Sequence, residues 1–148
     1  MTKEKLKKNA KDAEKYIKNV LDGKKTPFFK VIYLPVCVLT KIQKILGYLP
    51  DYHFISANEI RHANNNHGIN GKKLKTGDLP LTKQDFCLIP YILQNPTDVI
   101  AGTDSVTNRK SIKFVKKLED SEIVYVECEK YDDANIFHTI TAWKNKKC

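Results

Sequence analysis

The sequence predicts an α+β fold in which N-terminal helices are followed by an antiparallel sheet of about four strands. Apolar residues recur at helical spacing in the first 21 residues, whereas short segments of alternating polarity, separated by turns, follow Asn95 and Pro96. The chain has 148 residues, of which 41% are hydrophobic and 29% charged. This size and composition suit a single domain, with or without a terminal extension.

The N-terminal third is predicted to be mainly helical. Residues 1–25 form a basic amphipathic helix, set apart from a second unit over residues 26–148, and Asp22 with Gly23 ends the helix. The stretch FFKVIYLPVCV is expected to be extended, because it is rich in β-branched and aromatic residues. A short helix is expected over Lys41–Leu46, before Gly47.

The segment SANEIRHANNNHG predicts a helix that begins after Ser56 and ends at Gly68. Ser56 caps its start, and Glu59 is expected to reach back to the Ser56 amide in a capping box. His67 then lies near the last carbonyl groups, where the helix dipole predicts a raised pKa. The three asparagines before it need hydrogen-bond partners if they are buried, so this helix end is expected to face something polar.

The second half begins with a further helix and continues as strands. Thr82 and Asp85 repeat the cap pattern, and Pro90 is expected to kink or split the apolar helix that follows. Four strands with antiparallel meander spacing are then predicted. They cover Val99–Thr103, Ser111–Leu118, Glu122–Lys130 and Ile136–Trp143.

Two features of these strands bear on function. In the last strand, regular alternation places His138 on one face and both Thr139 and Thr141 on the other. Lys116 falls in phase with the apolar residues of its own strand. A bulge or a lysine that snorkels at a sheet edge explains this position structurally, and a site that faces a phosphate explains it functionally.

The net charge and the cysteines indicate the kind of partner and the cellular compartment to expect. The net charge of +9 indicates a polyanionic partner, and since Arg61 and Arg109 are the only arginines, contacts to phosphate are favoured over base readout. The cysteines are widely spaced, and those at positions 37, 87 and 128 have apolar neighbours, so free, buried thiols in a reducing cytoplasm are expected. The apolar run from Val31 is interrupted by proline and lysines, and neither a membrane span nor export is expected.

His62 and His67 suit acid–base chemistry better than metal binding. Their spacing of five residues places them about 140° apart around a helix, so they do not form a helical metal pair. Cleavage of RNA through its own 2′-hydroxyl needs a base, an acid and groups that stabilise the phosphate charge, which two imidazoles, strand threonines and lysines can supply. Each of these histidines and threonines, taken alone, also has a structural explanation as a surface, capping, strand or core residue. His53 is interpreted as structural.

Three segments together resemble a known family. They are IRHANNNHG, the block DLPLTKQDFCLIPYILQNP, and the strand ending HTITAWK. Over roughly Phe54 to Lys144 the chain resembles the phage-associated members of the barnase/EndoU/colicin/RelE (BECR) nuclease superfamily. The resemblance implies metal-independent RNA cleavage by a toxin or mobile-element protein. His62, His67 and Thr141 match the positions of its histidines and threonine, and Lys116 matches a basic position. Trp143 replaces the usual tyrosine, and His138 is an additional histidine.

The resulting prediction is a cytoplasmic endoribonuclease without cofactor or metal, whose nuclease domain covers residues 26–148. Its substrate is structured RNA such as tRNA, and an immunity or inhibitor protein is a further expected partner. The predicted catalytic residues are His62, His67, Thr141, Thr139 and Lys116, and the predicted substrate-binding residues are Arg61, Asn66 and His138. The alternative is a non-catalytic module that binds nucleic acid or blocks a host factor. The N-terminal lysines suit either a docking arm or an ordinary solvated face.

Overall fold

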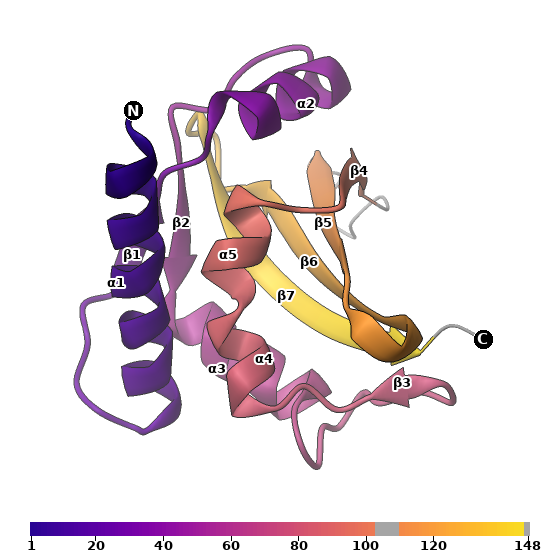
Figure 1. Cartoon of the computed structure of the whole chain (residues 1–148). Coiled ribbons are helices and arrows are strands. Elements are labelled where there is room, and N and C mark those ends of the chain that lie inside the picture. Colours follow the sequence, from indigo (N-terminus) through magenta and orange to yellow (C-terminus); the bar gives the residue numbers. More distant parts are fainter. Residues whose placement is uncertain (103–109, 147–148) are drawn as a thin grey trace.

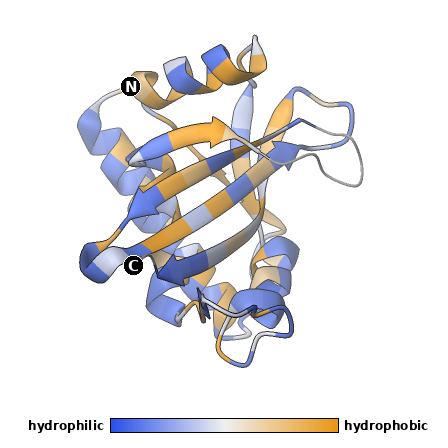
Figure 2. Cartoon of the chain, turned by 90° about the vertical axis from the view of Figure 1, so that its right-hand side faces the viewer, coloured by the Kyte–Doolittle hydropathy of each residue, from blue (hydrophilic) through white to orange (hydrophobic). Residues whose placement is uncertain are grey.

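One mixed sheet, five α-helices and a short 3-10 helix, Glu119–Ser121, make up the computed structural model, which describes residues 1–102 and 110–146. The helices are α1 (Lys3–Leu21), α2 (Val36–Leu46), α3 (Ala57–His67), α4 (Lys83–Cys87) and α5 (Ile89–Gln94). The strands are β1 (Phe29–Ile32), β2 (Tyr52–Ser56), β3 (Asp78–Leu79), β4 (Asp98–Ala101), β5 (Ser111–Lys117), β6 (Glu122–Lys130) and β7 (Ile136–Lys146). Helices α1, α4 and α5 lie on one side of the sheet (Figure 1), and no helix crosses β5 to β7 on the other side (Figure 2). We call this second side the open face.

The α+β class is confirmed, but the sheet has more strands than predicted. Its order is β1-β2-β7-β6-β5-β4, and β3 pairs separately with β7. Strand β2 runs parallel to β7, whereas the other pairs are antiparallel. The expected four-stranded antiparallel meander corresponds to β4–β7. Strand β1 lies within the stretch FFKVIYLPVCV, which was predicted to be extended, whereas β2 and β3 were not predicted and have only five and two residues.

Strand β7 leaves part of one edge free for a site. On that edge β2 pairs with Ile136 to His138, and β3 pairs with Lys144 and Asn145. The residues between these two pairings have no strand partner on that side among the pairings of the described chain. Helix α3 follows β2 directly in the chain and packs against β7. The sheet topology therefore brings the histidine-bearing helix to the middle of the last strand.

Helix α1 is built into the core. Its buried face includes Ala13 and Ile17, both fully buried in the main apolar cluster. The Asn9 Nδ2 donates to the carbonyl of Val31 at 3.0 Å, and its Oδ1 accepts from the amide of Tyr33 at 2.8 Å. These two bonds satisfy backbone groups along β1, which is an edge strand. Most of the lysines of α1 remain exposed on its outer face.

Helix α2 corrects the prediction for the apolar stretch before it. The strand ends at Ile32, and the helix begins at Val36 rather than at Lys41. Pro35 occupies the N-cap position, where a missing amide hydrogen costs little. Val38, Ile42 and Leu46 follow at intervals of four and are all buried, so helical packing outweighs the β propensity of this segment.

The remaining elements agree closely with the sequence. Thr82 and Asp85 form the expected capping box, and the helix around Pro90 is split into α4 and α5 at Leu88. The bounds of β6 are those predicted, and β5 ends one residue early at Lys117. Strand β7 continues beyond Trp143 to Lys146. The predicted end of β4, Thr103, lies outside the described residues.

The cysteines are free, as expected, but they are not all buried. Cys128 is fully buried and Cys87 is partly buried, whereas Cys37 is exposed because its neighbour Val38 takes the core-facing position in α2. Cys148 lies outside the described residues. Burial raises the pKa of the Cys128 thiol.

Iodoacetamide is expected to modify Cys37 in the folded protein much faster than Cys128. Alkylation requires an accessible thiolate, and both burial and the raised pKa protect Cys128. Peptide mass spectrometry after short reaction times measures the two rates, with urea-unfolded protein as the control in which both react. Equal rates in the folded protein would contradict the packing described here.

Within the described part of the chain, no helix is both long enough and apolar enough to cross a lipid bilayer.

Candidate functional site

An open cavity of about 440 Å³ lies between α3 and the open face of β7. It brings together residues from three parts of the chain: α3, the loop after it, and strands β6 and β7 with their connection. The lining residues are Glu59, His62, Asn66, His67, Lys73, Glu129, Tyr131, His138, Ile140 and Thr141. Five of the residues predicted from the sequence are therefore gathered in one place: His62, His67, Asn66, His138 and Thr141.

Helix α3 is fixed at both ends. The Ser56 Oγ accepts a hydrogen bond from the Glu59 amide at 3.2 Å. The helix ends at Gly68, where a Cβ atom would lie 2.2 Å from the Asn64 side-chain oxygen, so only glycine fits without rearrangement. The last residue of the helix is held as well, because the Leu81 amide donates a hydrogen bond to the His67 carbonyl at 2.8 Å. The positions of both histidines are thus set by the backbone around them.

His62 is exposed at the rim of the cavity and pairs with Asn66, which is only 9% exposed. The Asn66 Nδ2 lies 3.1 Å from the His62 Nε2. An amide nitrogen only donates, so this imidazole nitrogen accepts, and neutral His62 carries its proton on Nδ1. If the amide turns over, Asn66 presents its oxygen to the imidazolium instead. One asparagine can therefore orient His62 in either protonation state.

His67 is partly buried, and its pKa is lowered, which corrects the raised pKa expected from the helix dipole. Burial is the main cause, and it outweighs the carboxylate of Asp78, which acts in the opposite direction. The nearby charges of Lys73, His62 and Lys75 lower the pKa further. The Nδ1 of His67 is buried and has no hydrogen-bond partner among the described residues.

Thr141 reaches the cavity because β7 contains a bulge. Glu127 of β6 pairs with Thr141 while the next residue, Cys128, pairs with Thr139, so Ile140 is the extra residue. The bulge shifts the alternation, and Thr141 joins His138 on the open face. The expectation that Thr139 and Thr141 share a face is therefore wrong.

Thr139 lies in the core instead of the cavity. It is 2% exposed, and its Oγ1 lies 3.0 Å from the Nε2 of His53. His53 is itself buried, with a pKa lowered to about 3 by burial and by His138. Both residues belong to the packed side of the sheet, which agrees with the structural interpretation of His53.

Lys116 and Arg61 also lie outside the cavity. The Lys116 Nζ donates to the Asn95 carbonyl at 2.9 Å, next to the end of α5 on the covered side of the sheet. This contact fits the snorkelling alternative, and it does not place Lys116 with the other predicted catalytic residues. Arg61 is exposed and donates a hydrogen bond to the Asn58 side-chain oxygen at 3.1 Å. Burial raises the pKa of the Tyr16 phenol on α1, and Arg61 lies close enough to oppose this rise weakly. The structure thus separates these two cations from the histidines.

His138 forms the floor of the cavity. It is 7% exposed, and its ring stacks on Phe54 with a centroid distance of 5.2 Å and an interplanar angle of 28°. Tyr131 meets the same ring edge-on at 5.1 Å. These contacts hold the imidazole in one orientation, whereas His62 at the rim is exposed.

Two carboxylates that line the cavity, Glu59 and Glu129, were not predicted from the sequence as site residues. Burial raises the pKa of Glu59, the neighbouring charge of His62 lowers it, and Glu129 raises it again. Glu59 was interpreted as the returning half of the cap of α3, but no such bond is present among the described residues, and its side chain lines the cavity. The available signal was its spacing, because residues three apart share a helix face and Glu59 stands three positions before His62.

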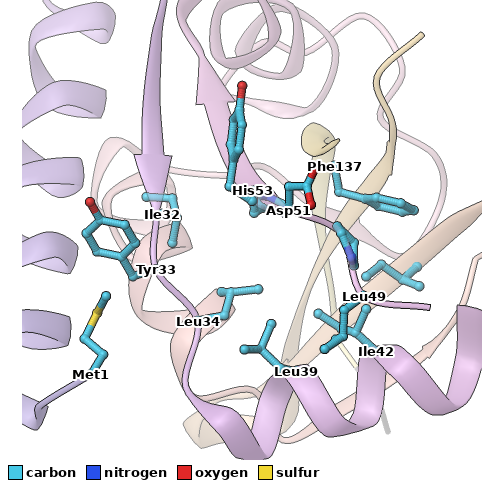
Figure 3. A pocket seen from close by; sticks show the side chains of 13 residues that line it. Met1, Ile32, Tyr33, Leu34, Leu39, Ile42, Leu49, Asp51, His53 and Phe137 are labelled. Carbon is cyan, nitrogen blue, oxygen red and sulfur yellow. The ribbon is translucent and has the colours of Figure 1, made fainter. Parts of the chain in front are cut away.

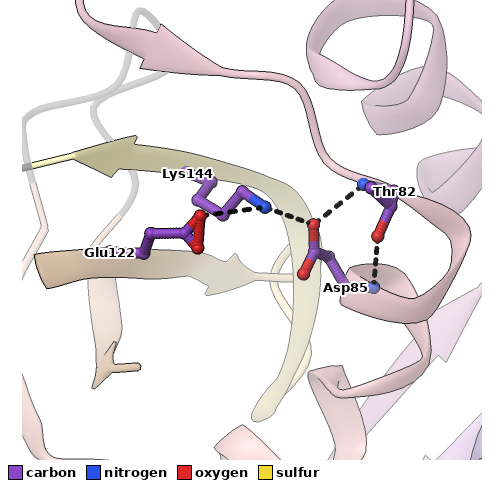
Figure 4. A network of polar contacts seen from close by, with 4 residues as sticks. All are labelled: Thr82, Asp85, Glu122 and Lys144. Carbon is purple, nitrogen blue, oxygen red and sulfur yellow. Dashed lines mark hydrogen bonds and ion pairs between the residues drawn. The ribbon is translucent and has the colours of Figure 1, made fainter. Parts of the chain in front are cut away.

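A second polar network anchors the strand that carries the site (Figure 4). The Lys144 Nζ lies 2.7 Å from the Asp85 Oδ2, which also accepts from the Thr82 amide at 2.9 Å. Glu122 is 3.9 Å from the same ammonium group. Asp85 therefore fastens α4 to β7. Nothing in the spacing of the last strand had indicated that Lys144 is buried.

A separate apolar cavity of about 230 Å³ lies beneath α2 (Figure 3). Aliphatic and aromatic side chains line most of it, and His53 is its only histidine. Because the His53 pKa is about 3, this imidazole remains neutral and does not exchange a proton near neutral pH. The cavity beside α3 is lined by three histidines and two glutamates, whereas the apolar cavity has His53 and Asp51 as its histidine and its carboxylate among the described residues.

Comparison with known proteins places the chain in a family. Residues 36–147 match the family model described as phage-Barnase-EndoU-ColicinE5/D-RelE like nuclease3. This match defines the chain as a nuclease-like domain. The chain belongs to this phage-associated nuclease family, and the match begins earlier than the resemblance from Phe54, so that it includes α2. No curated protein and no solved structure matches the chain significantly.

The cavity residues do not include an arranged metal-binding group. Among residues 1–102 and 110–146, no cluster of three or more His, Cys, Asp or Glu side chains is placed to hold a metal ion.

Proposed function

We propose that the protein is a metal-independent endoribonuclease that cleaves RNA by attack of a 2′-hydroxyl on the adjacent phosphate. One observation carries the proposal: His62, His67 and Thr141, which lie on a helix and a distant strand, line the same open cavity. Two imidazoles can move the two protons of this reaction, and a hydroxyl can bind a phosphate oxygen. Membership in a nuclease family supports the assignment in general terms.

The cavity suggests a division of roles. His67 is the base, because its lowered pKa keeps it neutral and able to accept the 2′-hydroxyl proton. His62 is the acid that protonates the leaving 5′-oxygen, and its exposure allows it to exchange protons with water. Asn66 orients His62, Thr141 binds the phosphate, and Lys73 stabilises the negative charge that develops there. His138 is proposed as a substrate contact.

Purified protein is expected to fragment pooled cellular RNA in the presence of EDTA and to leave DNA of the same length intact. DNA lacks the 2′-hydroxyl that serves as the nucleophile. Gel electrophoresis of both pools measures the difference, and the His62→Ala variant serves as the inactive control. If wild-type protein leaves every RNA pool uncut, the enzymatic proposal fails.

The loss of cleavage activity at low pH is expected to follow the protonation of His67. A base must be unprotonated to act, so cleavage is expected to fall only when the pH drops below the lowered pKa of His67. This midpoint is expected below 6.5, the ordinary value for histidine. The pH dependence of kcat/KM and an NMR titration of the His67 ring measure it independently. A His67 midpoint at or above 6.5 would be inconsistent with the burial described.

We further propose that the enzyme acts in the cytoplasm as a toxin or mobile-element protein on structured RNA such as tRNA, with an immunity or inhibitor protein as partner. Expression in bacteria offers a test. Growth arrest by the wild type, relieved by His62→Ala, supports catalysis. Arrest that persists in the variant supports the alternative, a nuclease-like module that binds nucleic acid or blocks a host factor.

A further inference from the structure

The open face beside the cavity carries a row of aromatic rings. Trp143 of β7 stands opposite Tyr125 of β6, and their rings stack with a centroid distance of 5.2 Å and an interplanar angle of 15°. The His67 ring lies 6.5 Å from Trp143 on a different element. Both Tyr125 and Trp143 are partly exposed, and no helix covers this side of β5 to β7 (Figure 2). The aromatic row therefore runs from the cavity out onto the open sheet.

The charges near this row are divided between its two ends. Glu59 and Glu129 lie at the end of the cavity that holds His62 and His138. Lysines gather at the other end: Lys73 and Lys75 lie close enough to lower the pKa of His67, and the Lys113 Nζ is 5.5 Å from the centre of the Trp143 ring. Two carboxylates also lie there: Asp78 accepts a hydrogen bond from the Lys75 amide, and Glu127 of β6 stands opposite Lys113 of β5 and Thr141 of β7. The three lysines outnumber these two carboxylates.

An aromatic surface flanked by lysines matches the chemistry of single-stranded RNA. Every nucleobase has a flat π face that stacks on aromatic side chains, and the adjoining phosphates are attracted to ammonium groups. Carboxylates at the opposite end repel phosphate. An RNA strand that places its phosphate beside His67 is therefore expected to continue toward Trp143 rather than toward Glu129.

We propose that Trp143 and Tyr125 form a nucleobase-binding platform, with Lys113 as its phosphate contact, which holds the base next to the scissile phosphate. This inference rests on the proposed ribonuclease function and adds a substrate-binding site that recognises unpaired RNA. Stacking is tolerant of sequence, so the platform positions the strand and selects for unpaired over paired bases.

Trp143 is the only tryptophan of the chain, so its fluorescence reports directly on the platform. A single-stranded 2′-O-methyl RNA, which lacks the nucleophile and cannot be cleaved, is expected to quench this fluorescence on binding. A fully abasic strand of the same length keeps the phosphates but has no bases. It is expected to bind about 5- to 150-fold more weakly and to leave the fluorescence unchanged. Equal affinity and equal quenching by the two strands would overturn the platform.

Substitutions separate the platform from catalysis. Trp143→Leu is expected to weaken binding of a dye-labelled 2′-O-methyl strand by about 5- to 150-fold. Trp143→Phe is expected to retain most of the affinity, because phenylalanine keeps an aromatic ring. Tyr33→Leu, which removes an exposed aromatic beside β1, is the matched control and is expected to bind normally. Circular dichroism verifies that each variant is folded.

The possible results distinguish the two proposals. Binding with quenching but without any cleavage of ordinary RNA retains the platform and rejects the enzyme. Cleavage of RNA with an unchanged KM in Trp143→Leu retains the enzyme and rejects the platform. The platform is also rejected if the wild type cleaves RNA but does not bind the 2′-O-methyl strand at the same protein concentrations.

Discussion

Replacing His67 with alanine is expected to lower the rate of RNA cleavage by about 10²- to 10⁴-fold, the usual contribution of a general acid or base. The loss is predicted to appear mainly in kcat, because a proton is transferred only in the transition state. Single-turnover cleavage of a labelled RNA measures it without interference from product release.

The fold is expected to survive this substitution. The His67 Nδ1 has no hydrogen-bond partner among the described residues, and the contact that fixes the end of α3 uses the His67 carbonyl, which alanine retains. Asn65→Ala is the matched control, since Asn65 is exposed on the same turn and does not line the cavity. A folded His67→Ala variant with a rate within about threefold of wild type would remove His67 from the proposed mechanism.

Lys144→Met is expected to lower the free energy of unfolding by about 3–5 kcal/mol, the usual cost of leaving one member of a buried ion pair without its partner. The Lys144 and Asp85 side chains are only 9% and 11% exposed, and their charged atoms are 2.7 Å apart. Asp85 also holds the start of α4 through the Thr82 amide, so an unpaired carboxylate there weakens the helix contact with β7. Urea unfolding followed by circular dichroism measures the loss.

An exposed lysine–aspartate pair provides the control for this experiment. Lys83 pairs with Asp22 at the surface, and Lys83→Met is expected to leave the unfolding midpoint nearly unchanged because solvent screens that pair. Adding Asp85→Asn to Lys144→Met is expected to recover part of the stability, since the buried charge is then absent. Equal unfolding midpoints for Lys144→Met and Lys83→Met would show that the Lys144–Asp85 pair does not anchor β7.

The sequence allowed much of the helical half and the strands β4 to β7 to be predicted, because their signals are local. Capping by Ser56 and Thr82, the stop at Gly68 and the break near Pro90 each depend on a few adjacent residues. The parallel pairing of β2 with β7 depends on residues about 80 positions apart, and no local pattern encodes it. Strand β2 was missed for this reason, and β3 has only two residues.

The candidate site was likewise predictable only where its signals are local. His62, His67 and Asn66 share one short helix end and could be grouped from spacing alone. The choice between Thr139 and Thr141 depends on the bulge at Ile140, which reverses the alternation without any glycine to signal it. Glu59 was missed because one local explanation, the helix cap, already accounted for it, and the burial of Lys144 depends on a partner 59 residues away.

The chemical nature of the RNA ends produced in EDTA tests the central claim most directly. If the two histidines promote attack by the 2′-hydroxyl, mass spectrometry of the fragments is expected to find 2′,3′-cyclic phosphate on one side of each cut and 5′-hydroxyl on the other. Fragments that carry 5′-phosphate and 3′-hydroxyl ends instead would show that water is the nucleophile and would contradict the account.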